Sequence, residues 1–322
     1  MPIDPFELQP LPHGTAPHDS ILPAHDEDLA TAALDGRAGF LQSMARVFAE
    51  NKLAVASLVV LIVIVLLCFV GPFFYTTNQT DANDALLNSI QNSPPSWSHP
   101  FGTDDSGFDV LGRIMYGGQI ALIVGFLSAM VATIIGVAYG ALSGFFGGWF
   151  DALAMRFVDI GLSIPVLFLL IALVAIYRPT VPILIFVIAA VSWLVPARLI
   201  RAETLSLRTR EYVQAVRTFG GSRRRIIGRH IVPNSVGTIV VFATFDVADS
   251  ILLLAALGFL GLGVPAPQTD WGTMLSNGVN YASSGYWWEI YPVGIAIVLV
   301  VVALNYIGDA LRDALEVRLQ RN

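Results

Sequence analysis

Charged residues are scarce in this chain: Asp, Glu, Lys and Arg make up only 13% of its 322 residues, whereas 55% of the residues are hydrophobic. A soluble domain carries about 25% charged residues. A deficit of this size, in a chain too long for one small core, argues against an ordinary soluble domain. It predicts a polytopic membrane protein, to be analysed by hydropathy.

Cysteine and lysine are nearly absent, with one residue of each, Cys68 and Lys52. A single cysteine excludes an intrachain disulfide, and its place in an apolar run predicts a packing or lipid-facing residue. A phosphate-binding P-loop needs a lysine after a glycine-rich turn, but Lys52 stands in AENKLAV, which has no such turn. We therefore expect no ATP site, no cofactor and no enzymatic activity on this chain.

Metal-ligand patterns are also lacking, because the five histidines show no ligand spacing and three of them fall in the N-terminal tail. An apolar run after a basic N-terminus is missing too, so we expect no cleavable signal. The acidic residues are unevenly placed: residues 1–36 contain seven of them and no Lys or Arg. This composition predicts a disordered cytoplasmic tail.

Long apolar runs, by contrast, are abundant. A helix needs about 20 apolar residues to cross a bilayer, and runs this long are too long for barrel strands. The fold class predicted is therefore an all-α polytopic membrane protein with six transmembrane helices. The six spans are expected at residues 53–75, 119–143, 153–177, 182–200, 235–258 and 291–310. In the second span, Gly136, Gly140 and Gly144 recur every four residues, which predicts close helix packing.

Basic residues near the span ends predict the orientation, because cytoplasmic loops carry an excess of Lys and Arg. They gather before the first span, between the fourth and fifth spans, and after the last span. The loops predicted on the other side, 76–118, 178–181 and 259–290, hold only Arg113 and Arg178. Both termini are therefore predicted to be cytoplasmic.

The remaining segments divide around these spans. Residues 37–52 present apolar side chains on one helical face, which favours an interfacial helix; a plain extension of the first span is the alternative. The predicted organisation lists 1–36 as the tail, 37–52 as the interfacial helix, 53–75 as the first span, 76–118 as an extracytoplasmic loop, 119–318 as a five-span core with a cytoplasmic loop at 201–234, and 319–322 as a C-terminal tail.

One dense basic segment interrupts the apolar core: EYVQAVRTFGGSRRRIIGRHIVPN, residues 211–234. Its spacing predicts two short amphipathic helices. A first apolar stripe is formed by Tyr212, Ala215, Val216 and Phe219, and a second by Ile226, Ile227 and Ile231. Gly220 and Gly221 are expected to stop the first helix, Ser222 to cap the second, and Pro233 to end it before the fifth span.

Three interpretations of this segment compete. A basic loop could only fix topology and touch anionic lipid. Nucleic-acid binding has no other support in the sequence, and we expect none. The third interpretation is a docking site for a cytoplasmic partner, and we favour it because a topology loop needs charge but does not need two apolar stripes around a glycine pair.

The same segment resembles the cytoplasmic loop of ABC importer permeases, whose pattern is Glu-Ala-Ala, three residues, Gly, nine residues, Ile-x-Leu-Pro. Aligned on Gly220 and Pro233, this chain reads Gln214-Ala215-Val216 at the start and has His230 and Val232 near the end. The dipeptide/oligopeptide/nickel branch is more similar, because Tyr-Val and Arg-His-Ile-x-Pro-Asn are usual there.

Further matches to this branch are FGTDDSGFDVLGRIMYGGQIALIVG (101–125), MRFVDIGLSIP (155–165), AALGFLGLGVPAPQTDWGTML (255–275) and NYIGDALRDAL (305–315). The set is most similar to the C-type permease of peptide importers. Two positions depart from the family: Phe108 stands where Arg is usual, and Leu254 where an acid is frequent.

The resemblance implies a type I importer permease fold and a coupling role for the loop, which in that family sits in a groove of the ATPase subunit. Transferred to this chain, the coupling loop 208–233 comprises Tyr212, Val213, Gln214, Ala215, Val216, Phe219, Gly220, Arg224, Ile227 and Pro233. The implied partners are a second homologous permease, two ATPase subunits that bind ATP and Mg, an extracytoplasmic solute-binding protein and the lipid bilayer.

Two carboxylates, Asp246 and Asp249, stand three residues apart in the fifth span. An intramembrane carboxylate by default faces a polar cavity, so both are candidates for the translocation path, with a helix–helix hydrogen bond as the alternative. Asn305 in the sixth span is a further candidate, either for the path or for a bond between helices. Arg156 and Asp159 are spaced for an i,i+3 ion pair.

The outer side offers candidates for docking the binding protein: Asp104, Asp105, Asp109 and Trp271. The three acids can equally stabilise the start of the second helix, and Asp109 is spaced to pair with Arg113. For Trp271, a gate or a contact with delivered substrate is an alternative. The aromatic residues Tyr286, Trp287, Trp288 and Tyr291 are expected to form an interfacial belt.

Taken together, these features predict a permease subunit of an ATP-driven importer for di- or oligopeptides in the bacterial inner membrane. A nickel or glutathione importer of the same branch is one alternative. An ion-coupled secondary transporter using Asp246 and Asp249 is another; the inverted repeats of broken helices typical of that class are not apparent in the sequence. The substrate itself is not readable from these residues.

Overall fold

The structure is a computed structural model that describes residues 48–79 and 91–319, with positions 81, 83, 85 and 87 between them and side chains up to residue 315. These residues belong to one compact unit, Met44–Asn322. Within them the regular structure is helical, and only an isolated bridge between Thr103 and Asp109 has β geometry. The tail 1–36, most of the predicted helix 37–52 and residues 320–322 lie outside the described residues.

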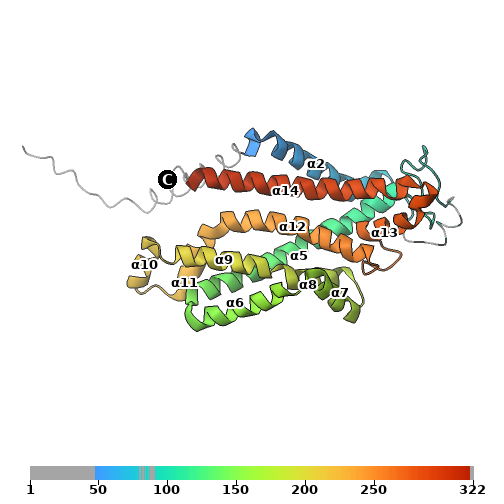
Figure 1. The fold of residues 1–322 in the computed structure, drawn as a ribbon. Helices are drawn as coiled ribbons and strands as arrows, with labels where there is room; N and C mark the ends of the chain where they lie inside the picture. Colours follow the sequence, from blue (N-terminus) through green and yellow to red (C-terminus); the bar gives the residue numbers. More distant parts are fainter. Residues whose placement is uncertain are drawn as a thin grey trace, which may run out of the picture. The chain divides into compact units, whose positions relative to one another are not determined.

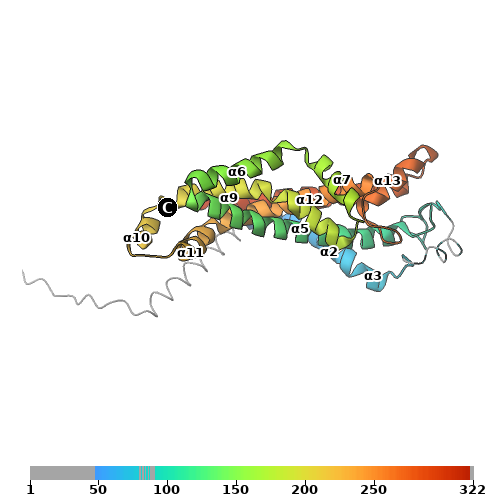
Figure 2. The same ribbon diagram turned by 90° about the horizontal axis from the view of Figure 1, so that it is seen from below.

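The longer helices run roughly side by side (Figures 1 and 2). In chain order the elements are α2 (Lys52–Phe69), α3 (Gly71–Phe74), α5 (Val110–Phe146), α6 (Gly148–Ser163), α7 (Val166–Ile176), α8 (Val181–Ser192), α9 (Leu194–Leu207), α10 (Glu211–Thr218), α11 (Arg223–Ile226), η1 (Ile227–Ile231), η2 (Val232–Ser235), α12 (Val236–Phe259), α13 (Trp271–Tyr281), η3 (Ala282–Ser284), η4 (Trp287–Glu289) and α14 (Tyr291–Leu319).

The described residues contain six candidate spans only if each of two bent helix pairs is counted as one span. Four stretches of the described chain are long and apolar enough to cross a membrane alone: 52–69, 110–146, 223–259 and 287–315. The third and fourth predicted spans are instead broken, α6 from α7 by 87° and α8 from α9 by 43°. The sequence predicted a span in each of these two stretches but did not predict the bends.

Prolines explain both breaks. Ile164 precedes Pro165 and is extended, with φ −91° and ψ 127°, because a residue before proline is disfavoured in the helical region. Pro196 has no N–H to offer the carbonyl of Ser192 four residues earlier.

The start of α2 bears on the two alternatives for residues 37–52. Asn51 has φ −85° and ψ 99°, and its side chain accepts hydrogen bonds from the amides of Leu53 and Ala54. Asn51 therefore interrupts the helix as an N-cap, so the first span does not extend without a break toward its N-terminal side.

α5 lies at the centre of the bundle and packs against α2, α8, α9 and α12. Its glycine stripe faces α9: a Cβ on Gly136 would lie 2.7 Å from Pro196 Cβ, one on Gly144 would lie 2.8 Å from the Arg201 carbonyl oxygen, and one on Gly140 would collide with the Ala197 carbonyl oxygen. The predicted close approach is confirmed. Cys68 is buried in the core cluster with Ile64 and Val124, so its packing role is confirmed too.

Two ion pairs hold α6 to α9. Arg201 grips Asp151 with two hydrogen bonds of 2.6 Å each, and Ser143 donates a further bond of 2.5 Å to the same carboxylate. Asp159 pairs with Arg198 at 2.5 Å, and both side chains are about half exposed, 51% and 54%. The predicted pair of Arg156 with Asp159 was therefore wrong, because the tertiary fold brings an arginine of another helix to that carboxylate.

These two pairs should differ in their contribution to stability. Arg201→Gln leaves the Asp151 carboxylate, which is nearly buried, without its charged partner, and should lower the free energy of unfolding by about 2–3 kcal/mol. Arg198→Gln removes a solvent-screened pair and should cost about 0–1 kcal/mol. Thermal unfolding of the purified variants in one detergent measures the difference. Equal losses in both variants would contradict the buried-pair argument.

Candidate functional site

The segment between α9 and α12 forms a compact cap at one end of the bundle, called here the α10 end (Figure 1). α10 ends as the glycine pair predicts: the amide of Gly221 donates to the carbonyl of Val216 at 2.9 Å, and that of Gly220 to Arg217 at 3.1 Å. Gly220 has φ +80°, the left-handed conformation that this Schellman motif requires. Ser222 caps α11 through its contact with the Arg225 amide at 3.4 Å.

The second short helix differs from the prediction. α11 has only four residues and continues through the π turn η1 and the 3-10 turn η2 into α12, so that 223–259 is one continuous helical stretch. Pro233 lies at the start of η2 and does not separate α11 from the fifth span. This is possible because a proline in the first turn of a helical element costs no hydrogen bond.

The cap has two different faces, which the predicted stripes did not separate. Val213, Ile226 and Ile231 are buried against Phe145 of α5, with Val216 and Ile227 packed beside them. Tyr212, Ala215 and Phe219 point outward, and Phe219 is 91% exposed. Grouping Val216 with Tyr212 and Phe219 in one stripe was therefore wrong, since Val216 belongs to the anchored face.

Polar contacts fix the same cap to α5. Arg208 donates to the carbonyl of Gly144 at 2.8 Å, and Gln214 donates to the carbonyl of Arg208 at 3.1 Å. The guanidinium of Arg223 lies 5.2 Å from the ring centre of Phe146. Gln214, which stands where the related pattern has Glu, thus makes a contact within its own loop, while Arg224 is exposed.

A groove of about 730 Å³ lies beside the two span carboxylates. It is lined by both Asp246 and Asp249 of α12 and by apolar residues that flank the two helix breaks, among them Pro165 and Pro196. Asp249 is exposed, and Oδ2 of Asp246 is buried without a hydrogen bond from any described residue. The bends in α6–α7 and α8–α9 therefore open the space that the two carboxylates face.

Asn305 stands apart from this groove. Its amide donates to the carbonyl of Val301 on its own helix at 2.8 Å and the residue is exposed. Asn305 therefore makes no hydrogen bond to another described helix of this chain and is absent from the groove lining; its place in the path stays a prediction. Leu254, which stands where the related branch often has an acid, is buried in the core.

The opposite end of the bundle, called here the α13 end, buries two of the four predicted docking residues. Asp109 caps α5 through the amide of Gly112 at 2.7 Å and also contacts His99 at 2.8 Å. Trp271 is only 1% exposed, and its indole N–H donates to the carbonyl of Ile114 at 3.0 Å. Neither side chain offers a docking surface in this structure.

Asp104 and Asp105 remain partly accessible at this end. Asp104 pairs with Arg113 at 3.3 Å, so the predicted partner of Arg113, Asp109, was wrong. Arg113 also donates to the Pro267 carbonyl at 2.8 Å and lies 4.0 Å from the ring centre of Phe108. Asp105 accepts a bond of 3.3 Å from Tyr281. Burial raises the pKa of Asp104, while the charge of Arg113 and the amide of Phe108 oppose this shift.

Sequence reasoning missed three structural residues here. Asp270 caps α13 and accepts bonds from the Thr273 amide at 3.0 Å and its hydroxyl at 2.8 Å; an acid directly before a helix was the available signal. Trp288, expected in an aromatic belt, is buried and donates to the Thr103 carbonyl at 3.3 Å. Glu289 is buried beside it, and no local pattern marks it.

In the part of the chain that the structure describes, no three His, Cys, Asp or Glu residues cluster in the way that a transition-metal site needs. The cap, the groove and the acidic α13 end therefore remain as the candidate functional surfaces, and each can be compared with known proteins.

A family model described as a binding-protein-dependent transport system inner membrane component matches residues 132–321. This range covers the groove, the cap and α14. A second model, the N-terminal TM domain of oligopeptide transport permease C, matches residues 39–95.

Several curated proteins are similar over almost the whole chain. The dipeptide transport system permease protein of Alkalihalophilus pseudofirmus is 39% identical, covering 91% of this chain and 93% of the relative. The one of Bacillus subtilis is 34% identical, covering 100% and 99%. The oligopeptide transport system permease protein of Haemophilus influenzae is 40% identical, covering 88% and 90%.

The matches exclude the ion-coupled secondary transporter as the class of this protein, despite its broken helices. The matched residues include the predicted spans, the cap and the groove, so one family assignment covers all three. The chain belongs to the family of binding-protein-dependent transport system inner membrane components and is a multi-pass permease subunit of an ABC importer in the inner membrane.

Proposed function

We propose that this permease subunit carries di- or oligopeptides, and that the α10 cap couples its groove to ATP hydrolysis on partner subunits. The peptide substrate is supported by the names of the relatives, which are dipeptide and oligopeptide transport permeases. The observation that carries the coupling role is the division of the cap into an anchored face and an exposed aromatic face.

The α10 end faces the cytoplasm in this proposal. The cap holds Arg217, Arg223, Arg224, Arg225 and Arg229, and an excess of basic residues near span ends is typical of the cytoplasmic side. The C-terminal end of α14 lies at the same end of the bundle (Figure 1). Both termini are then cytoplasmic, as the sequence predicts.

The exposed face of α10 is the proposed contact for an ATPase subunit. Tyr212 and Phe219 lie outward on a helix whose other face is fixed to α5 through Val213 and Phe145. Exposed aromatic side chains on a rigid support are typical of residues that dominate binding energy. Because this helix is anchored, a displacement of α10 would also displace α5. The hydrogen bond from Arg208 to the Gly144 carbonyl is a second connection between the cap and α5.

ATP and Mg belong to the two ATPase subunits in this proposal, since the only lysine of this chain lacks the glycine-rich turn of a P-loop. The second, homologous permease supplies the other half of the path. Closure of the ATPase subunits biases the permease pair between inward-facing and outward-facing states, as a ligand on another chain biases a two-state element.

In this proposal, the groove beside Asp246 and Asp249 is the part of the translocation path that this chain contributes. Its lining is mostly apolar with two carboxylates, which suits a peptide with variable side chains and a positively charged amino group. At the α13 end, the accessible acids Asp104 and Asp105 are the remaining candidates for docking the extracytoplasmic binding protein.

The substrate is tested by uptake into proteoliposomes that hold the permease pair, the ATPase subunits and the binding protein. We expect ATP-dependent uptake of a labelled di- or oligopeptide, with little uptake of nickel or glutathione. Uptake of nickel or glutathione in place of peptides would contradict the peptide substrate and identify the protein as a nickel or glutathione importer permease of the same branch. Uptake driven by a proton gradient without ATP or partner chains would contradict the importer class itself.

The coupling face is tested by Phe219→Ala. Because Phe219 is 91% exposed, the change should leave the spans folded but remove an aromatic anchor, and lower the affinity for the ATPase subunits about tenfold or more. Co-purification of those subunits and ATP-dependent uptake measure the effect. Phe168→Ala on α7 is the matched control, since Phe168 is also exposed, at 71%. Equal losses in both variants would refute the coupling role of Phe219.

The path is tested by Asp246→Asn, which removes one charge and keeps the side-chain size. We expect uptake of peptides with a free amino group to fall about tenfold, and the preference over N-acetylated peptides to shrink. Asp313→Asn, at an exposed position near the end of α14, should leave uptake unchanged. Unaltered uptake and assembly in Asp246→Asn would remove Asp246 from the path and favour a packing role.

A further inference from the structure

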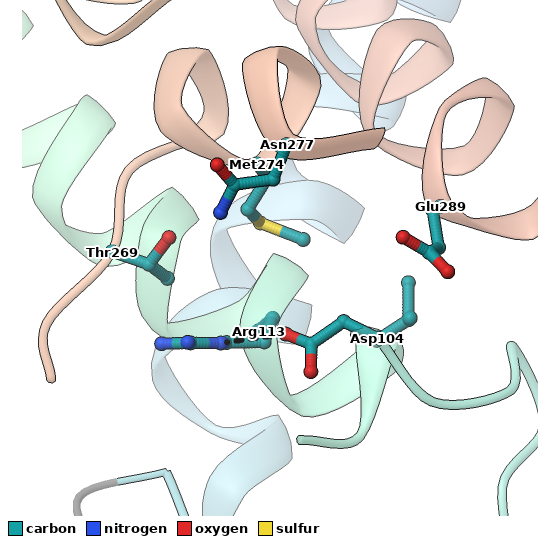
Figure 3. A pocket seen from close by; sticks show the side chains of 7 residues that line it. Asp104, Arg113, Thr269, Met274, Asn277 and Glu289 are labelled. Carbon is teal, nitrogen blue, oxygen red and sulfur yellow. Dashed lines mark hydrogen bonds and ion pairs between the residues drawn. The ribbon is translucent and has the colours of Figure 1, made fainter. Parts of the chain in front are cut away.

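A small cavity at the α13 end brings together side chains from three segments that are distant in the sequence (Figure 3). Its volume is about 20 Å³, enough for one guest of the size of a water molecule. The polar residues that line it are Asp104, Arg113, Thr269, Asn277 and Glu289, with Val110 and Met274 completing the wall.

Glu289 is the unusual member of this group. Its residue is only 4% exposed, and its Oε1 atom receives no hydrogen bond from any described residue. Figure 3 shows its carboxylate turned toward the space that Asp104 also faces. A buried carboxylate oxygen without a donor is costly, so its setting calls for a positive or hydrogen-bond-donating guest.

The charges around the cavity do not balance. Arg113 is the one cation among the lining residues, and it is engaged by Asp104 at 3.3 Å and by the Pro267 carbonyl at 2.8 Å. Asp105 lies outside this lining, and its carboxylate accepts a hydrogen bond from Tyr281. The positive charge of Arg113 is thus matched by Asp104, and the carboxylate of Glu289 is left in excess.

The oxygen atoms that line the cavity indicate which kind of ion would neutralise its excess negative charge. Carboxylate, amide and hydroxyl oxygens are hard ligands that suit alkali and alkaline-earth cations rather than transition metals. One excess negative charge beside a fixed arginine suits a single positive charge better than two.

We propose that this cavity binds one monovalent cation, held between the carboxylates of Glu289 and Asp104, which face the same space (Figure 3). The ion ties η4 to the loop before α5, the loop to which Trp288 and Tyr281 are also joined by hydrogen bonds to Thr103 and Asp105. It stabilises the α13 end of the permease whatever substrate the importer carries.

The test measures thermal unfolding of the permease, assembled with its partner subunits in lipid nanodiscs, in sodium, potassium or choline chloride at equal ionic strength. Binding to the folded state alone should raise the midpoint for one alkali ion over choline by about 5 °C at a hundredfold excess over its Kd. Glu289→Gln should abolish this difference. Glu203→Gln on α9 is the matched control and should retain it.

A location experiment on the unaltered protein supports the stability test, in case Glu289→Gln does not fold. Thallous ions replace sodium or potassium, and an anomalous difference map should show one peak within contact distance of Glu289. Equal midpoints in all three salts, an alkali-ion shift that persists in Glu289→Gln, or a cavity without a thallium peak would each overturn the proposal and assign the cavity to water.

Discussion

The close contact between α5 and α9 is the constraint on which most of this structure depends. Gly136, Gly140 and Gly144 let the two backbones meet where any side chain would collide, and in a bilayer such packing replaces the hydrophobic driving force that soluble helices use. With α9 fixed in this way, Arg201 reaches Asp151 of α6. The same contact sets the position from which the chain leaves α9 and enters the cap.

Buried polar groups then decide how each end of the bundle is held. At the α10 end, Asp151 accepts bonds from Arg201 and Ser143, and Arg208 bonds to Gly144, so that charge and backbone are satisfied together. At the α13 end, Asp109 and Asp270 cap helices, but Glu289 keeps an unpaired oxygen. At the first end the group left without a hydrogen bond from any described residue is the neutral hydroxyl of Thr204, whereas at the second end it is an oxygen of a carboxylate, which costs more to bury.

Hydropathy and local spacing predicted the elements that depend on local rules. The spans, the glycine contact, the Ser222 cap and the stop at Gly220 follow from apolar length, four-residue spacing and backbone conformation, and all were found. Contacts between helices were not predictable in this way. Spacing offered Arg156 for Asp159 and Asp109 for Arg113, whereas the fold supplied Arg198 and Asp104. The bends at Pro165 and Pro196 were overlooked although proline marks them, because apolar length alone was counted.

The cap shows that the buried face of an amphipathic helix is identified by its contacts in the fold, because the periodicity of its apolar residues alone can group buried and exposed side chains together. Periodicity placed Val216 with Tyr212 and Phe219, but Val216 packs with the group around Phe145, while the two aromatic residues remain outside. A helix free on all sides would turn when pushed and transmit little. The helix is fixed on one face through Val213 and Phe145 and is stopped by the left-handed Gly220, so it is held against α5. In the coupling role proposed above, this anchored face would carry a displacement of the cap to the spans, and the basic residues around it would favour the cytoplasmic side.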